Sequence, residues 1–179
     1  FADSHQKLFF NQLSLKLSFF HIIFTSYITN VFCYIAYPKI LQQMESIHID
    51  GTLVSPTVDF NLETRVLEID GYSRPENVRD FYFPLIEWLD ELNKYLVKFK
   101  SSNIVVEPFT FNFKYVYFNS SSAKFIYDII ILLNGFKKDG FPIKIYWYFD
   151  EDDDELREAG EELSDMANVP FLFIATKKG

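Results

Sequence analysis

Residues 109–118 constrain the fold more than any other part of the chain, because they alternate aromatic residues with other side chains. The odd positions are all aromatic: Phe109, Phe111, Phe113, Tyr115 and Tyr117. A period of two sends alternate side chains to opposite faces of a strand, so we expect one face of this strand to be buried. The strand is expected to stop at Asn119 and a run of serines.

Three segments have the period of an amphipathic helix. Directly after the serines, apolar residues recur at helical spacing: Ile126, Ile129, Ile130 and Leu133, with Phe125, Leu132 and Phe136 widening the stripe. An earlier stripe starts after Pro75 and consists of Val78, Phe81, Leu85, Leu89, Leu92 and Leu96. Pro84 lies inside that stripe and predicts a helix that either kinks there or begins there. A third helix is expected over residues 155–167.

The remaining apolar segments have the length and punctuation of strands. Short strands are expected at residues 47–50, 57–60 and 66–70, followed by a buried strand at 143–149 and a last one at 170–175. Strands that alternate with helices favour an α/β fold, and right-handed crossovers limit its topology. We therefore predict one mixed sheet of four to five strands, with helices packed mainly on one face.

Composition excludes several classes of protein. Half of the residues are apolar, which argues against disorder. The net charge is −8, which argues against binding to nucleic acid. Cys33 is the single cysteine, so neither an intrachain disulfide nor a two-cysteine metal or redox site can form. A reducing, cytoplasmic location is the default expectation.

The first 43 residues differ in composition from the rest. They carry a charge of +2, which leaves −10 for residues 44–179, and the first methionine is Met44. Residues 17–37 are uncharged and long enough to span a bilayer, which makes a membrane anchor the alternative interpretation. Five polar residues weaken it: His21, Thr25, Ser26, Thr29 and Asn30. We therefore expect upstream translated sequence at 1–43 and a regulatory domain at 44–179.

Residues 44–179 lack the patterns of common catalytic sites. His48 is their only histidine, and no G-x-S-x-G turn is present to support a Ser-His-Asp site. The glycines are scattered, so no phosphate-binding loop is predicted. We expect a protein that is not an enzyme and that needs no cofactor.

The acidic run at residues 150–155 raises the question of calcium. Asp150, Asp152 and Asp154 alternate as in a calcium loop, but Glu155 stands where that loop requires glycine. Acidic side chains are also favoured at the N-terminus of a helix by its dipole. We therefore predict a helix start here and no metal site.

A candidate modification site lies where the aromatic strand meets the second helix. Asn119 is followed by Ser120, Ser121 and Ser122, and Lys124 lies one helical turn after Ser120. The free N–H groups and the dipole of a helix N-terminus favour a phosphate at this position. Asn and Ser are also the preferred N-cap residues, so helix capping alone is the alternative interpretation.

Five motifs spread over residues 44–179 resemble the pattern of a known family. They are Gly71-x-Ser73-x-Pro75-Glu76-Asn77, Trp88 in the first helix, Tyr117-Phe118-Asn119-Ser120-Ser121-Ser122-x-Lys124, Trp147-x-Phe149-Asp150 and Pro170-Phe171. In these motifs the chain resembles the SiaC family of bacterial regulatory phosphoproteins, whose fold is similar to the STAS domain of anti-sigma factor antagonists. The resemblance covers nearly all of residues 44–179 and none of 1–43.

The resemblance implies a partner-switching protein. In such a switch, a Ser/Thr protein kinase phosphorylates the protein and a PP2C-type phosphatase reverses the modification. The unphosphorylated form binds and activates a diguanylate cyclase, which raises cyclic di-GMP and favours biofilm. The alternative function is a constitutive STAS-like adaptor or ligand-binding module without phosphorylation.

The resemblance also assigns residues to this role. The phosphorylated residue is the hydroxyl residue directly after Asn119, which is Ser120, and Ser121 and Ser122 remain alternatives because three serines are consecutive. The family motif Pro75-Glu76-Asn77 lies in a strand-to-helix turn, where either a capping or a binding role is open.

Overall fold

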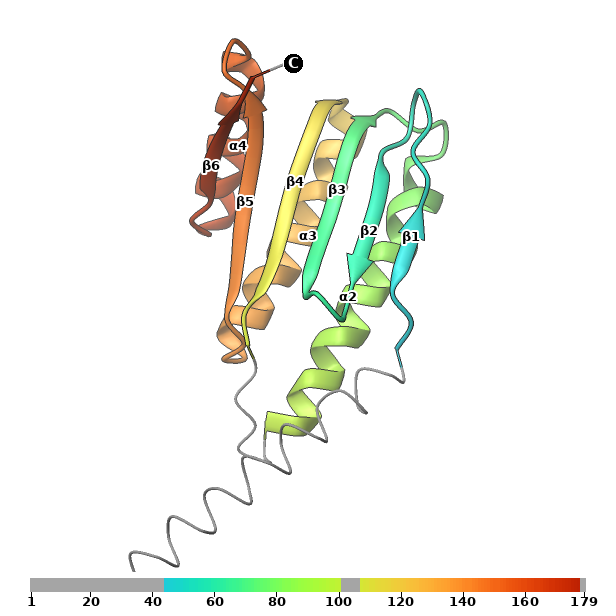
Figure 1. Cartoon of the computed structure of the whole chain (residues 1–179), viewed down its shortest axis with the longest axis vertical. Helices are drawn as coiled ribbons and strands as arrows, with labels where there is room; N and C mark the ends of the chain where they lie inside the picture. The colour runs from blue at the N-terminus through green and yellow to red at the C-terminus, as the bar shows by residue number, and fades with distance from the viewer. Residues whose placement is uncertain (1–43, 101–106, 178–179) are drawn as a thin grey trace, which may run out of the picture.

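The computed structural model describes residues 44–100 and 107–177, which form one sheet and three helices (Figure 1). The elements follow one another as β1 (Ile47–Ile49), β2 (Thr57–Asn61), β3 (Val66–Ser73), α2 (Val78–Lys100), β4 (Phe109–Phe118), α3 (Ser120–Lys138), β5 (Ile143–Asp150), α4 (Asp154–Ala167) and β6 (Leu172–Thr176). The predicted mixed α/β class is confirmed. The predicted four to five strands were too few, because the short β1 completes a sheet of six.

The strands lie in the sheet in the order in which they occur in the chain. β1, β2 and β3 pair antiparallel, whereas β3, β4, β5 and β6 pair parallel. Each parallel pair is joined by one helix, and all three helices lie behind the sheet in Figure 1. The carboxyl ends of β3, β4 and β5, and the N-termini of the helices that follow them, therefore share one edge of the sheet.

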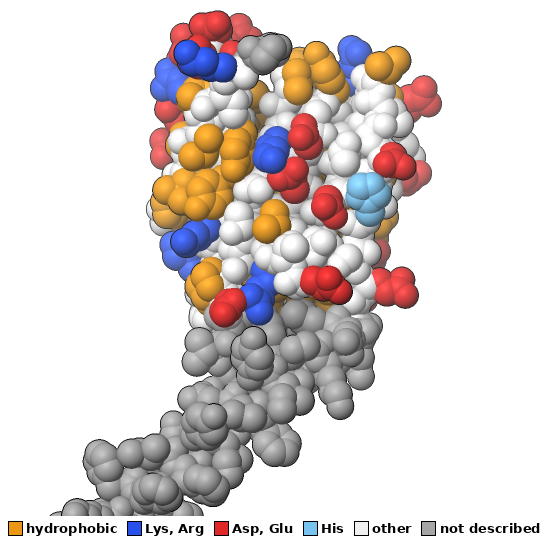
Figure 2. Space-filling view, in the orientation of Figure 1, with side chains coloured by type: hydrophobic (Ala, Val, Ile, Leu, Met, Phe, Trp, Pro, Cys, Tyr) orange, Lys and Arg blue, Asp and Glu red, His pale blue; other side chains and the backbone are white. Residues whose placement is uncertain are grey.

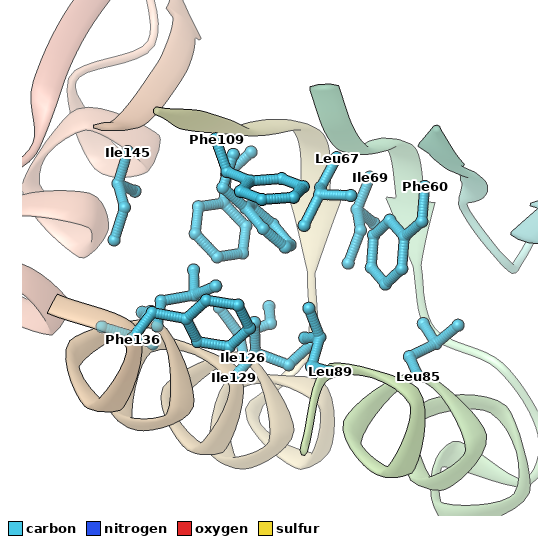
Figure 3. Close-up of a cluster of buried hydrophobic side chains, with 14 of the residues drawn as sticks. Phe60, Leu67, Ile69, Leu85, Leu89, Phe109, Ile126, Ile129, Phe136 and Ile145 are labelled. Atoms are coloured by element: carbon cyan, nitrogen blue, oxygen red, sulfur yellow. The ribbon is translucent and has the colours of Figure 1, made fainter. Parts of the chain in front are cut away.

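The hydrophobic core fills the layer between the sheet and the helices. Figure 3 shows Phe60, Leu67 and Phe109 from the sheet facing Leu85 and Ile126 from the helices. All five side chains are fully buried. Burial of large apolar side chains on one face of each element is the main stabilising term for a domain of this size.

The opposite face of the sheet has no helix among the described residues. Figure 2 shows this face, with charged side chains over β3 and β4 and a group of hydrophobic side chains over β5 and β6. Leu172 and Ile174 of β6 are 49% and 36% exposed, and their register partners are Tyr146 and Tyr148 of β5.

A β-bulge ends the predicted alternation of β4 before Tyr117. Gly71 pairs with Tyr115 and Tyr72 pairs with Tyr117, which leaves Val116 as an extra residue in β4. The bulge reverses the side-chain alternation, so Tyr117 is 48% exposed while Phe118 packs against the core. The expectation that Tyr117 shares the face of Tyr115 was therefore wrong.

The helix boundaries lie close to the predicted ones. α2 begins at Val78, six residues before Pro84, so the proline does not start the helix. Tyr82 is fully buried although the predicted stripe omitted it, and Phe81 is only partly buried. α4 begins at Asp154, one residue before the predicted start.

The interpretations of residues 1–43 lie outside the described residues. In the part of the chain that the structure describes, no helix is long and apolar enough to cross a membrane.

Helix α4 approaches the sheet closely at Gly160, which gives a test of the packing. A Cβ atom at this position would lie 2.5–2.7 Å from atoms of the buried Trp147 indole. Since Trp147 is fully buried and its Nε1 donates to the carbonyl of Leu156, the ring has little freedom to move. We predict that Gly160→Ala lowers the free energy of unfolding by about 1–3 kcal/mol, measured by urea denaturation.

Gly135 in α3 is the matched control. Its nearest contact for an added Cβ is Asn93 Nδ2 at 3.9 Å, an ordinary van der Waals distance. Gly135→Ala is therefore expected to raise the free energy of unfolding by about 0.5–1 kcal/mol. Equal effects of the two substitutions would contradict the described approach of α4 to Trp147.

Candidate functional site

Asn119 connects β4 directly to α3 and serves as the N-cap of the helix. Its backbone is extended, with φ −85° and ψ 168°, and its side-chain Oδ1 accepts a hydrogen bond from the N–H of Ser122 at 2.8 Å. Its own N–H donates to the carbonyl of Ser73 at 3.1 Å, and its carbonyl accepts from the N–H of Ala123. The backbone bond to Ser73 thereby fixes the start of α3 to the end of β3, and the side-chain bond caps the helix.

Ser122 differs from the two serines before it, because its side chain is buried inside the domain. It is fully buried, and its hydroxyl donates to the carbonyl of Ser73 at 3.0 Å. The hydroxyl of Ser73 in turn donates to Ser122 Oγ at 2.9 Å. Ser120 and Ser121, by contrast, are exposed at the first turn of the helix.

Two buried tyrosines extend this pair into a chain of hydroxyls. Tyr82 OH lies 2.6 Å from Ser73 Oγ, and Tyr115 OH lies 3.1 Å from Tyr82 OH. Because Ser73 uses its only proton toward Ser122, Tyr82 must donate to Ser73, and Tyr115 must then donate to Tyr82. The proton order is therefore Tyr115 to Tyr82 to Ser73 to Ser122, ending at a backbone carbonyl.

We call these four residues, Ser73, Tyr82, Tyr115 and Ser122, the hydroxyl chain. Its members come from β3, α2, β4 and α3, so it joins four elements directly beneath the exposed serines. Burial raises the pKa of Tyr82 and raises that of Tyr115 well above the ordinary value, so both hydroxyls keep their protons at neutral pH. A satisfied buried network of this kind specifies one arrangement of the elements it joins.

The family motif before α2 lies at the same edge of the sheet. Asn77 Oδ1 accepts from the N–H of Asp80 at 3.3 Å, and the carbonyl of Asn77 accepts from Phe81 at 3.2 Å. Asn77 therefore caps α2 as Asn119 caps α3. Glu76 is exposed and Pro75 is partly buried beside it.

Lys124 lies one turn into α3 and is exposed. Its Nζ lies 5.3 Å from the centre of the Phe125 ring, a cation–π distance. The structure thus places the ammonium group over an aromatic ring at the start of α3.

An apolar surface lies beside the exposed serines at the carboxyl edge of the sheet. Tyr72 and Tyr117 are register partners that are 45% and 48% exposed, and Val116 of the bulge is 40% exposed. Leu53 and Val54 of the β1–β2 loop are exposed nearby, and the carbonyl of Val54 accepts from the N–H of Arg74 just after β3. We call these five residues the serine-edge patch.

The acidic run forms the turn between β5 and α4. Asp153 caps α4, with its Oδ1 accepting from the N–H of Leu156 at 2.9 Å, and Asp150 Oδ1 accepts from the N–H of Asp152. Within residues 44–100 and 107–177, no group of three His, Cys, Asp or Glu side chains is arranged to hold a metal ion.

Comparison with known proteins identifies the family. The model of the SiaC family regulatory phosphoproteins matches residues 49–176. The chain belongs to the SiaC family. An uncharacterised protein of Pseudomonas aeruginosa (strain UCBPP-PA14) is 27% identical over 132 residues, which cover 74% of this chain and 98% of that protein.

Two solved structures of SiaC from Pseudomonas aeruginosa also match the chain. The crystal structure of apo-SiaC has a TM-score of 0.62 and 26% identity, and the match covers 74% of this chain and all of that one. A crystal structure of the diguanylate cyclase SiaD in complex with its activator SiaC matches with a TM-score of 0.62 and 25% identity. That match covers 73% of this chain and 99% of the other.

Sequence reasoning missed the hydroxyl chain, although one signal for it was present. Tyr115 lies in the aromatic alternation of residues 109–117, where Phe would fit equally well, so its buried hydroxyl needs a hydrogen-bond partner. Tyr82 lay outside the predicted apolar stripe and gave no such signal. Ser73 was part of the family motif, but nothing in the spacing predicted its contact with Ser122, 49 residues away.

The proton order of the hydroxyl chain gives a testable difference between its two tyrosines. Tyr82→Phe removes two hydrogen bonds and leaves Tyr115 OH buried without an acceptor, so we predict a loss of about 1–3 kcal/mol in the free energy of unfolding. Tyr115→Phe removes only the terminal donor and is expected to cost about 0.5–1.5 kcal/mol. Urea denaturation at neutral pH measures both, and a larger loss for Tyr115→Phe would contradict this order.

Proposed function

We propose that this SiaC family member is a regulatory phosphoprotein, switched by phosphorylation of Ser120, that binds and activates a diguanylate cyclase when unmodified. The observation that carries the proposal is the position of Ser120. Its exposed side chain begins a helix whose start is held by Asn119, directly beside the exposed apolar serine-edge patch. A kinase can therefore reach the same place at which a partner would bury apolar surface.

Burial argues against Ser122 as the target and leaves Ser120 and Ser121. Ser122 is fully buried and uses its hydroxyl within the hydroxyl chain, so a kinase would have to unfold the start of α3 to reach it. Ser121 is exposed and stays the alternative target. The position directly after Asn119 supports Ser120, since the family pattern places the modified hydroxyl there.

A diguanylate cyclase as the partner is supported by the crystal structure from Pseudomonas aeruginosa in which the cyclase SiaD is bound to its activator SiaC. Activation would raise cyclic di-GMP and favour biofilm. In this role the chain acts by binding and not by catalysis.

Electrostatics explains how one phosphate could reverse binding. A phosphoserine adds a charge of about −1.5 to −2 and, at a helix N-terminus, is stabilised by free N–H groups and the dipole. Burying the same charge in an interface that suits a neutral hydroxyl and an apolar patch costs several kcal/mol. A change from mostly bound to mostly free needs about 5.5 kcal/mol of differential affinity, which a central phosphate can supply.

The other partners follow from the chemistry of such a switch. A Ser/Thr protein kinase supplies ATP and magnesium, and a PP2C-type phosphatase removes the phosphate, so the chain needs no cofactor of its own. A cytoplasmic location fits ATP as the phosphoryl donor.

The N-cap supports a second candidate function. Asn119 and Ser122 both have structural roles that account for their presence without phosphorylation. The chain would then be a constitutive adaptor or ligand-binding module whose serines only start a helix.

Paired substitutions separate the two functions. With the cognate kinase and ATP, the parent chain is expected to gain the mass of one phosphate group, Ser121→Ala to gain the same mass, and Ser120→Ala to gain none. Intact mass spectrometry measures this. An unmodified parent chain would support the adaptor, and a modified Ser120→Ala would move the site to Ser121.

The binding arm uses two substitutions of similar size. Ser120→Asp places a negative charge beside the serine-edge patch and is expected to weaken binding to the cyclase at least about tenfold, or about 1.4 kcal/mol. Ser120→Asn has nearly the same shape without the charge and is expected to bind like the parent. Equal weakening by both would indicate that size, and not charge, controls the interface.

A further inference from the structure

The two outer strands of the sheet differ in how well their free edges are protected. β1 spans three residues, and its exposed His48 lies next to the carboxylates of Asp50 and Asp59. A very short edge strand with polar or charged side chains resists pairing with another chain. β6, at the other edge, spans five residues, of which none is charged and none is proline: Leu172, Phe173, Ile174, Ala175 and Thr176. β6 therefore lacks the features that protect β1.

β6 is also regular, and in the described sheet no further strand pairs with its outer edge. Its pairing with β5 runs without a bulge from Leu172 opposite Tyr146 to Thr176 opposite Asp150. Figure 1 shows β6 at the outer side of the sheet, beside β5, and four of its five residues are exposed. A regular, uncharged edge of this kind pairs readily with another strand.

The direction of the backbone groups in β6 follows from a bond at its end. The carbonyl of Thr176 accepts from the N–H of Glu151 at 2.9 Å, so Thr176 directs its carbonyl toward the β5 side. Successive residues of a strand direct their N–H and C=O groups to alternate sides, so those of Ile174 also point toward β5. The N–H and C=O groups of Phe173 and Ala175 therefore point away from the described sheet.

We propose that β6 pairs antiparallel with β6 of a second copy of this chain, across a two-fold axis at Ile174. In this register Phe173 of one copy lies opposite Ala175 of the other. Because the N–H and C=O groups of both residues point outward, each such pair exchanges hydrogen bonds in both directions. A two-fold axis uses the edge of each copy once, so the product is a closed pair of chains and not a fibre.

The side chains of β6 suit this register. Phe173 packs against the core, so Leu172 and Ile174 lie on the open face of the sheet. There Ile174 of one copy meets Ile174 of the other, and Leu172 meets Thr176. A two-fold axis brings identical side chains together, and like charges directly opposite each other are destabilising. An uncharged strand can therefore pair with itself, and the hydrophobic group that Figure 2 shows over β5 and β6 becomes continuous across the two copies.

The inference goes beyond the proposed switch and does not rest on it. The serine-edge patch belongs to β3, β4 and the β1–β2 loop, and none of its residues lies in β6. Both copies keep this patch, so the pair presents two patches to a partner. A partner that has two binding sites of its own can then be held at both, which raises the overall affinity.

Substitutions at the two-fold axis test the pairing and its register together. Ile174→Lys places two ammonium groups opposite each other in a pair of identical chains, and Ile174→Glu places two carboxylates there. We expect the dissociation constant of either variant alone to be at least about tenfold higher than that of the parent pair, measured by sedimentation equilibrium on the full chain. An equimolar mixture of the two variants places lysine opposite glutamate and is expected to restore the mass of the pair.

Ile131→Lys is the matched control. Ile131 lies on α3 and is 43% exposed, similar to the 36% of Ile174, so the same substitution is made at an apolar surface position outside β6. We expect this variant to pair like the parent. A parent chain with the mass of a single chain at every concentration would overturn the proposal, and so would equal loss of pairing at the two positions.

Amide hydrogen exchange of the parent chain tests the register without any substitution. The outward amides of Phe173 and Ala175 are expected to exchange at least about tenfold more slowly at a concentration at which the pair forms than at high dilution. The amide of Ile174 points toward β5 and is expected to change little. Concentration-independent exchange at Phe173 and Ala175 would rule out this pairing.

Discussion

The hydrogen bonds between Ser122 and Ser73 hold the first turn of α3 against the end of β3, and the rest of the functional edge depends on them. Ser122 donates to the carbonyl of Ser73 and accepts from its hydroxyl, while Asn119 bonds to both residues through its backbone or side chain. Tyr82 and Tyr115 complete the buried hydrogen-bond network, which allows this turn only one arrangement. Ser120 is thereby held at the surface by contacts that do not involve its own hydroxyl.

A fixed helix start and an exposed apolar surface together allow a phosphate at Ser120 to weaken the binding of a partner. The bulge at Val116 turns Tyr117 outward next to Tyr72, so apolar surface reaches the helix start that a phosphate would occupy. A switch of this kind needs no refolding, because the modification changes the charge of a surface that is already formed.

The sequence predicted the elements well and their details at the functional edge less well. Alternating aromatics and helical stripes gave β4, α2 and α3 because burial on one face leaves a regular period. The bulge at Val116 could not be predicted, because the residues of the strand alternate in the same way in the sequence with or without a bulge. The bulge changes only the face of the sheet to which the last side chains of β4 point. Three identical serines likewise gave no sign that Ser122 faces inward, because that depends on Ser73 across the sheet.

The affinity of the singly phosphorylated chain for the cyclase tests the central claim most directly. Isothermal titration calorimetry would compare the chain phosphorylated at Ser120 with the unmodified chain against the same diguanylate cyclase. The account predicts binding by the unmodified chain and at least about hundredfold weaker binding by the phosphorylated one, a difference of about 2.8 kcal/mol. Equal affinities of the two forms would contradict it.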